Sequence, residues 1–361
     1  MSHADPLQPA ITAMMQDAAV PGLSIAVVRD DRLLYADALG WADLAARAPA
    51  STTTSYLWFS MSKIVTATAA LRLADDGRLD LDAPLDEYVD HLRAPGDIQP
   101  TTRQLLTHTA GLANPLPIRW VHRAEDSGPD PDVLLRRLTG RRRTFRYQVG
   151  GPGRYTNIGY LAAAQVIAAA AGRPFTDYVR EAVLEPAGMT GTGYTYPPGA
   201  PAATGYLRAP RGTGPLLHGV LPHGIVGPRH GRYLALRPFL VDGAGYGGLV
   251  GNVLDAARFL RLHLGNGQID GQRILSAETT RAMRRIQAQG KPFHHATGWF
   301  RRPVAGSTER YVEHFGAGAG FWNVMRLYPE RNLGIVVMTN STTSYRFDPL
   351  FHQLSRAPWP A

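Results

Sequence analysis

The sequence contains no cysteine, which excludes disulfides, a thiol nucleophile and metal sites built from thiolates. Long apolar runs are also missing, and no segment approaches the roughly 20 apolar residues that a membrane-spanning helix needs. The first six residues lack the basic start and apolar stretch of a secretory signal. We therefore expect the chain, as given, to be cytoplasmic and to act without a membrane.

Lysine is scarce: only Lys63 and Lys291 occur among the 38 basic residues, and all the others are arginine. An arginine side chain stays charged at any working pH, whereas a lysine can lose its proton and accept another. Lys63 follows Ser60 by three residues at the head of an apolar helical run, so the two side chains are expected to share one helix face. This arrangement is typical of a serine nucleophile with an adjacent base.

The Ser-x-x-Lys motif alone also fits an N-cap serine followed by a solvated lysine. Lys291, next to Gly290 and Pro292, looks like an ordinary loop residue and shows that the chain tolerates such lysines. The motif by itself leaves both interpretations open.

The chain has 361 residues and 44 % hydrophobic content, enough for a single catalytic unit with two lobes. Strand-like runs lie near both ends, and helical patterns dominate between them. The sequence therefore predicts an α+β fold: an antiparallel sheet built from both chain ends (about 1–80 and 285–361) and an inserted helical lobe (about 81–284). Within that lobe, segment 190–246 is rich in Gly, Pro and Tyr without periodicity, which predicts a long loop or lid.

Individual elements follow from periodicity and from helix-ending residues. Strands are expected at 22–28, 32–38, 297–301, 311–314, 321–328 and 332–339. Helices are expected at 6–18, from Ser60 to Gly77, and at 102–107, 131–138, 157–171, 175–184 and 253–264. Asp348 and Pro349 are expected to be the N-cap and first residue of a closing helix.

Three further motifs carry polar or glycine-rich signals. Tyr155-x-Asn157 begins a predicted helix, where a tyrosine can relay protons and an amide can orient a substrate carbonyl or the lysine. The segment from His314 to Ala317 ends a predicted edge strand, and its glycine lets a substrate lie close to a backbone amide that could face an oxyanion. Gly247-Gly248 suggests a close approach of two elements. Each motif alone also fits an ordinary helix start or turn.

Together and in this order, the motifs resemble the serine β-lactamase and penicillin-binding-protein superfamily, in the branch of class C β-lactamases, D-peptidases and related esterases. The resemblance extends to segments 20–28, 105–112, 185–190 and 333–340 and covers about residues 10–345. It implies the β-lactamase/transpeptidase fold and a serine hydrolase that acts through an acyl-enzyme.

The resemblance also implies a role for each site residue. Ser60 would attack the acyl carbon, Lys63 would take its proton, and Tyr155 would carry the proton to the leaving group and help to activate the deacylating water. Whether Lys63 or Tyr155 is the base stays open. The backbone amides of Ser60 and Ala317 would form the oxyanion hole. The substrate-binding residues would be Asn157, His314, Phe315, Gly316 and Ala317.

One departure from the family pattern bears on the substrate. Many β-lactamases carry Lys-Thr-Gly where this sequence has His314-Phe315-Gly316, so the charge and hydroxyl that commonly hold a carboxylate are missing, unless Arg154 replaces part of the charge. This favours hydrolysis of a neutral ester or amide. The alternatives are a transacylase, a β-lactamase or D-peptidase using the same serine, and a catalytically silent binding or scaffold relative.

The net charge of +9 invites a nucleic-acid interpretation, strongest at Arg136-Arg137 and in segment 141–146. Arginine pairs recur elsewhere without a nucleic-acid motif, so we interpret these runs as solvated surface and expect no nucleic-acid partner. We expect no cofactor and no metal, because no histidine pair stands at ligand spacing on a helix. His108 is interpreted as structural. A small-molecule acyl substrate is the expected partner, and the oligomeric state is not predicted.

Overall fold

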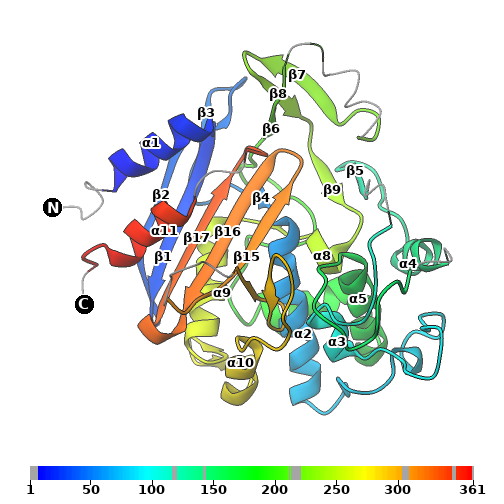
Figure 1. The fold of residues 1–361 in the computed structure, drawn as a ribbon. Coiled ribbons are helices and arrows are strands. Elements are labelled where there is room, and N and C mark those ends of the chain that lie inside the picture. The colour runs from blue at the N-terminus through cyan, green and yellow to red at the C-terminus, as the bar shows by residue number, and fades with distance from the viewer. Residues whose placement is uncertain are drawn as a thin grey trace.

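The computed structural model describes residues 7–115, 120–140, 144–210, 212, 221–302, 309–343 and 347–359. Its centre is an eight-stranded antiparallel sheet in the order β13-β14-β15-β16-β17-β1-β2-β3 (Figure 1). β1 comes from the N-terminal part and pairs with β17 from the C-terminal part, with Ile25 opposite Val337. The predicted α+β fold, with one sheet built from both chain ends, is confirmed. The strands are β1 (Gly22–Arg29), β2 (Arg32–Asp43), β3 (Ala48–Pro49), β13 (His294–His295), β14 (Phe300–Arg301), β15 (Val312–Gly318), β16 (Phe321–Tyr328) and β17 (Leu333–Thr339).

Alternation along the central strands gives the sheet two apolar faces. Leu23, Ile25 and Val27 pack with α1 (Gln8–Ala18) and α11 (Phe347–Arg356) on one face. Residues Ala26 and Val28 point to the other face, which α9 (Val253–Leu264) covers by packing on β1 and β17. α9 thus belongs to the sheet layer, although its residues fall within the range predicted for the helical lobe.

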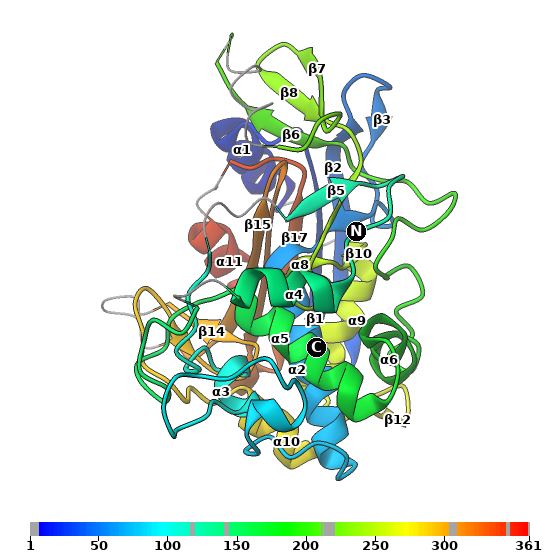
Figure 2. The same ribbon diagram turned by 90° about the vertical axis from the view of Figure 1, so that its right-hand side faces the viewer.

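The helical lobe packs around α2 (Ser62–Asp75) and α5 (Ile158–Ala171) (Figure 2). α5 is Ala-rich and largely buried, and it ends at Gly172, which has a left-handed φ of +64°. No helix in the described ranges is long and apolar enough to cross a membrane. The other helices are α3 (Thr102–Leu106), α4 (Pro131–Thr139), α6 (Phe175–Val179) with the following π-helical turn η3 (Arg180–Leu184), α8 (Ala244–Gly247), α10 (Ala277–Met283) and the short turns η1 (Phe59–Met61), η2 (Leu85–Glu87) and η4 (Pro329–Arg331).

The segment expected to be a long loop or lid contains regular structure. Its described part includes a three-stranded antiparallel sheet in the order β6-β8-β7, and β9 pairs with β5. The backbone N–H of Tyr206 in β6 donates to the Asn340 carbonyl at 3.1 Å, which ties the small sheet to the end of the main one. These strands are short and interrupted by glycines and prolines, so the sequence shows no alternating pattern that would predict them. The small strands are β4 (Tyr56–Leu57), β5 (Val121–Arg123), β6 (Gly205–Arg208), β7 (Val226–His230), β8 (Tyr233–Leu236), β9 (Phe239–Val241), β10 (Val250–Gly251), β11 (Gln268–Ile269) and β12 (Gln272–Arg273).

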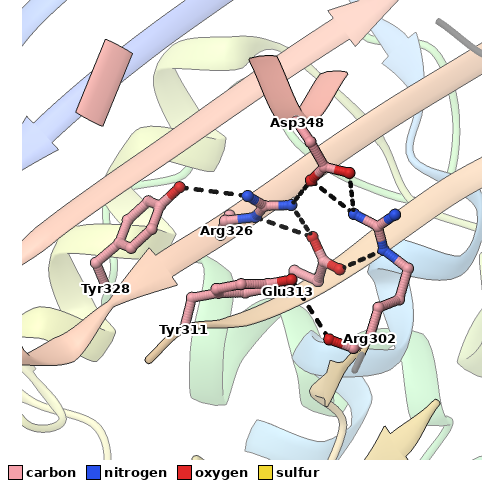
Figure 3. A network of polar contacts seen from close by, with 6 residues as sticks. All are labelled: Arg302, Tyr311, Glu313, Arg326, Tyr328 and Asp348. Carbon is pink, nitrogen blue, oxygen red and sulfur yellow. Dashed lines mark hydrogen bonds and ion pairs between the residues drawn. The ribbon is translucent and has the colours of Figure 1, made fainter. Parts of the chain in front are cut away.

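An ion-pair network fixes α11 to the sheet (Figure 3). Arg326 of β16 donates to Glu313 of β15 and to Asp348 of α11, each at 2.6 Å, and Arg302 joins the same two carboxylates at 2.8 Å. The prediction that Asp348 caps α11 is wrong, because the described helix already includes Phe347. The carboxylate of Asp348 is used instead to join α11 to the strand that carries His314.

Candidate active site

Ser60 lies in η1, a short turn directly before α2, which begins at Ser62 rather than at Ser60. The preceding residue, Phe59, has a left-handed φ of +46°, a strained conformation that clusters at functional sites. β15 holds this turn closely, because a Cβ at Gly316 would lie 1.9 Å from the Trp58 carbonyl oxygen. The serine itself remains partly exposed and so can be reached by a substrate.

Lys63 is fully buried in the first turn of α2, whereas Lys291 is exposed. The Nζ atom of Lys63 lies 3.0 Å from Ser60 Oγ, 2.9 Å from Asn157 Oδ1 and 3.0 Å from the carbonyl oxygen of Tyr246. Burial lowers the pKa of Lys63 well below its ordinary range, because a low-dielectric interior disfavours the ammonium.

The three oxygens around Lys63 Nζ are not equivalent. The amide oxygen of Asn157 and the carbonyl of Tyr246 can only accept hydrogen bonds, so they take the two N–H groups of a neutral amine. The remaining lone pair then faces Ser60, whose hydroxyl can donate as well as accept. When Lys63 is neutral, the arrangement therefore directs the serine proton at Nζ.

The segment that supplies the Tyr246 carbonyl lies along the start of α2. Thr66 Oγ1 donates to the Gly245 carbonyl at 2.7 Å, and the Leu249 N–H donates to Ser62 Oγ at 3.1 Å. These contacts explain the glycine-rich sequence, since a Cβ at Gly245 would lie 2.4 Å from the Tyr160 carbonyl oxygen. The sequence indicated a close approach here but gave no sign that a backbone carbonyl would bind the lysine.

Asn157 stands at the N-cap position of α5, yet its side chain makes no capping bond and reaches Lys63 instead. A second asparagine supplies the missing acceptor. Asn114 Oδ1 accepts from the backbone N–H groups of Asn157 and Ile158 at 2.7 and 3.2 Å, and from Thr156 Oγ1 at 3.0 Å. Asn114, which sequence reasoning missed, therefore frees Asn157 for the site.

Tyr155 lies next to both Ser60 and Lys63. Its hydroxyl is hydrogen-bonded to the Ser60 side chain, and Lys63 Nζ lies 4.8 Å from its ring centroid. Burial raises the pKa of the Tyr155 phenol well above its ordinary value, and the hydrogen bond to Ser60 offsets only part of this. Tyr155 is thus held as a neutral phenol, which can pass a proton on but is a poor resting base.

Three histidine rings surround Tyr155, with centroids 4.7 Å (His108), 5.9 Å (His314) and 6.4 Å (His295) from its ring. His108 Nδ1 accepts from the Thr156 N–H at 3.2 Å, so it supports the backbone beside Tyr155. Burial lowers the pKa of each ring, to about 4 for His295. The sequence gave no reason to place His295 here, and all three rings are neutral at pH 7.

His314 and Phe315 point to opposite faces of β15. His314 Nδ1 lies 2.8 Å from the Phe315 carbonyl oxygen, so Nδ1 carries the hydrogen and Nε2 keeps a free lone pair. The Phe315 ring packs on Phe347 of α11, with centroids 5.2 Å apart. The side chain of Phe315, which the resemblance placed among the substrate-binding residues, therefore lies on the face of β15 opposite to η1 and Ser60.

Ala317 presents its backbone at an open strand edge. The β15–β16 turn closes on the Gly318–Phe321 pair, so the alternate residue Ala317 directs its N–H away from β16. Trp322 lies opposite Ala317, and its carbonyl accepts from Thr339 Oγ1 of β17. The Trp322 carbonyl thus points away from β15, as expected for a pair of residues that are not hydrogen-bonded to each other. In the described part of the chain, β14 pairs with β15 only at Glu313, so the amide of Ala317 lies at an unpaired stretch of the strand edge.

Positive charge is sparse around these groups. The guanidinium of Arg154 lies 4.1 Å from the ring centroid of Tyr147 on an exposed surface, so it does not take the place of a lysine at His314. Among the described residues, no group of three or more His, Asp or Glu side chains could hold a metal ion. His3 and His218 lie outside the described residues.

Comparisons with known proteins agree with this geometry. The Beta-lactamase family profile matches residues 7–354. Protein Rv1367c of Mycobacterium tuberculosis (strain H37Rv) is 32 % identical over 302 residues, which cover 77 % of this chain and 70 % of that protein.

Two solved structures show the same fold. The octameric penicillin-binding protein homologue from Pyrococcus abyssi superposes with a TM-score of 0.80 at 24 % identity, covering 98 % of this chain and 78 % of its own. EstCE1, described as a hydrolase with promiscuous acyltransferase activity, superposes with a TM-score of 0.77 at 20 % identity and covers 98 % of both chains.

Proposed function

Because the chain belongs to the beta-lactamase family, we propose that it is a serine hydrolase that cleaves neutral esters or amides through an acyl-enzyme at Ser60. The observation that carries the proposal is the environment of Lys63, which is fully buried and whose Nζ contacts Ser60 Oγ and two oxygens that only accept. The site contains a hydroxyl nucleophile, a base with a lowered pKa and a phenol that can relay a proton.

In the acylation step, Ser60 Oγ attacks the acyl carbon while its proton moves to the lone pair of Lys63 Nζ. The resulting ammonium donates to Asn157, Tyr246 and the serine oxygen, so the hydrogen bond between Lys63 and Ser60 reverses direction. Tyr155 passes its proton to the leaving group and is reprotonated from Lys63, which returns both groups to neutrality. Deacylation repeats the sequence with water as the nucleophile.

The developing oxyanion needs donors where the charge appears. We propose the backbone amides of Ser60 and Ala317 for this role. The support is the position of η1 against β15 and the outward direction of the Ala317 N–H at the open strand edge. Gly316 is necessary for this approach, since a side chain there would collide with the Trp58 carbonyl.

The proposed preference for neutral substrates rests on charge. His314 is held neutral by burial, and Arg154 lies on Tyr147 rather than at the strand. A substrate carboxylate next to His314 would then lose water without gaining a charged donor, and such hydrogen bonds contribute about 1.5–3 kcal/mol. We therefore expect kcat/KM for anionic substrates to be lower by roughly one to two orders of magnitude.

A substrate panel tests the proposal. Purified protein would be assayed with p-nitrophenyl butyrate, D-aminoacyl amides and nitrocefin, with Ser60→Ala as the control for background hydrolysis. Neutral esters or amides should turn over fastest, and the Ser60→Ala variant should be inactive. Nitrocefin turnover equal to that of the butyrate would refute the neutral preference, and activity retained in Ser60→Ala would refute the serine mechanism.

Acyl transfer is the second candidate, because EstCE1 shares the fold and is described as having acyltransferase activity. Adding an amine or an alcohol to the ester assay separates the two functions. A transacylase would form the acylated acceptor at the expense of the free acid, whereas a hydrolase would release the same acid with or without acceptor.

A further inference from the structure

A cavity separate from the candidate active site lies at the start of β15, at the opposite end of the strand from Ser60. Its volume is about 970 Å³, and it is formed between the end of α9, the end of α10, the start of β15 and the η4 turn. Figure 1 places these elements around the lower part of the sheet. The volume falls within the range of small-molecule sites, roughly 300–1,000 Å³.

The lining of this cavity carries five guanidinium groups and one carboxylate. Leu264, Ile286 and Val312 add apolar surface, and Tyr311 forms part of the wall. The charged lining residues are Arg281, Arg284, Arg285, Arg301, Arg310 and Glu330.

Most of this positive charge is not neutralised by the protein. Glu330 pairs with Arg310 at 3.2 Å. Within the described ranges, Arg281, Arg285 and Arg301 form no ion pair or hydrogen bond through their side chains. Arg284, Arg285 and Arg301 therefore line one cavity although they come from two separate segments. The neighbouring Arg302 does not line it and instead belongs to the ion-pair network of Figure 3.

Arg284 shows most clearly how close these positive charges lie to one another. It is partly buried, and its side chain donates to the backbone carbonyl oxygen of His263 and to Asn266 Oδ1, each at 2.9 Å. Both acceptors are uncharged. Burial and the charge of Arg281 lower its pKa from the ordinary value. Clustered like charges in a partly enclosed space repel one another, and an anion placed between them would remove that repulsion.

We propose that this cavity binds a small organic polyphosphate, with its phosphates on the arginines and its apolar portion against Leu264, Ile286 and Val312. Guanidinium groups form bidentate hydrogen bonds with phosphate oxygens. Several such groups around one cavity fit a ligand with two or more phosphates better than one with a single anionic group. The wall residue Tyr311 also stacks on Arg326, with 4.1 Å between the guanidinium carbon and the ring centroid, so the ligand would lie beside the network that holds Glu313.

Isothermal titration calorimetry of the full chain tests the proposal, with pyrophosphate as the anion alone and ATP as a polyphosphate with an apolar portion. The test variant is Arg281→Gln/Arg285→Gln, which removes two exposed cavity arginines. The matched control is Arg47→Gln/Arg208→Gln, which removes the same charge from exposed positions outside the cavity lining. Thermal unfolding of both variants confirms that the fold is retained.

The proposal predicts one saturable site for both ligands, with tighter binding of ATP and weaker binding at higher salt. Affinity should fall by about tenfold or more in the cavity variant and stay the same in the control. Absence of binding at millimolar ligand would overturn the proposal. So would an equal loss in both variants, or binding of a DNA oligonucleotide without binding of pyrophosphate and ATP, because either result would indicate only a basic surface.

Discussion

The amide oxygen of Asn157 lies 2.9 Å from Lys63 Nζ, although 94 residues separate the two in sequence. The contact fixes one N–H of the lysine, and the Tyr246 carbonyl fixes a second at 3.0 Å. Only the lone pair of the neutral amine is left for Ser60. Asn157 thus helps to decide the direction of the hydrogen bond on which the proposed mechanism depends.

Asn157→Asp should raise the pKa of Lys63, because a carboxylate in place of the amide stabilises the ammonium. Since the base must be neutral to act, the acid limb of the pH–kcat profile should move to higher pH. Asn157→Ala is the control: it removes the oxygen without adding charge, so activity should fall without an upward shift of the limb. The same limb in the Asp variant and in the unaltered protein would contradict Lys63 as the base.

Lys63→Arg should be as damaging as Lys63→Met, since arginine keeps the charge but does not accept a proton at working pH. We expect kcat to fall by roughly 10²–10⁴-fold in both variants. Steady-state turnover of p-nitrophenyl butyrate measures this. Near-normal turnover with arginine would make Lys63 an electrostatic anchor and leave Tyr155 as the base.

Asn114→Ala should affect both stability and catalysis, because Asn114 Oδ1 accepts from two backbone N–H groups at the start of α5. Loss of a helix cap lowers the free energy of unfolding by about 1 kcal/mol. Displacement of the Asn157 side chain from Lys63 should in turn lower kcat. Asn114→Asp keeps the acceptor oxygen and should restore most of both properties. Urea unfolding and kcat measurements on the two variants test this, and equal defects in both would rule out the capping role.

Acid should destabilise the fold between about pH 6.5 and 4. Burial lowers the pKa of His295 to about 4 and that of His263 to about 3, from an ordinary value of 6.5. At acidic pH the unfolded chain therefore binds more protons at these histidines than the folded chain does. The free energy of unfolding is thus highest above pH 6.5 and decreases as the pH falls. Each such histidine should cost roughly 2 kcal/mol by pH 5.

Urea denaturation at pH 7 and pH 5 would measure this loss, with His295→Gln as the comparison, since that variant should show a smaller difference between the two pH values. Equal stability of the unaltered protein at both pH values would show that these histidines are not held neutral.

Elements with uninterrupted periodicity were predictable from sequence. Both β16 and α9 have the predicted bounds, and α9 is capped by Asn252, whose side chain accepts from the Asp255 N–H at 2.9 Å. The strand predicted at 297–301 is shorter, because the described pairing begins only at Phe300. The strands β6, β7 and β8 were not predicted, because each is short and is defined by its pairing with the others. The glycines and prolines between them interrupt the alternating pattern that would indicate a strand.

The site was predictable only in part. Helix spacing predicted that Ser60 and Lys63 share a face, and the resemblance to the β-lactamase superfamily implied that Tyr155 and Asn157 lie beside them; the structure brings all four residues together. Asn114, Tyr246 and His295 reach the site through contacts between segments far apart in the chain, and a backbone carbonyl as a lysine ligand leaves no residue pattern. The direction of the Phe315 ring was also beyond the sequence, because it depends on the pleat of β15 and on α11 covering that face.

The central claim is that Ser60 becomes acylated. Intact-protein and peptide mass spectrometry after incubation with a fluorophosphonate, and after rapid acid quench with p-nitrophenyl butyrate, tests it most directly. The account predicts one adduct on the peptide containing Ser60 in the unaltered protein, and none in Ser60→Ala at equal thermal stability. An unlabelled Ser60 in protein that still hydrolyses the ester, or an adduct that persists in Ser60→Ala, would contradict it.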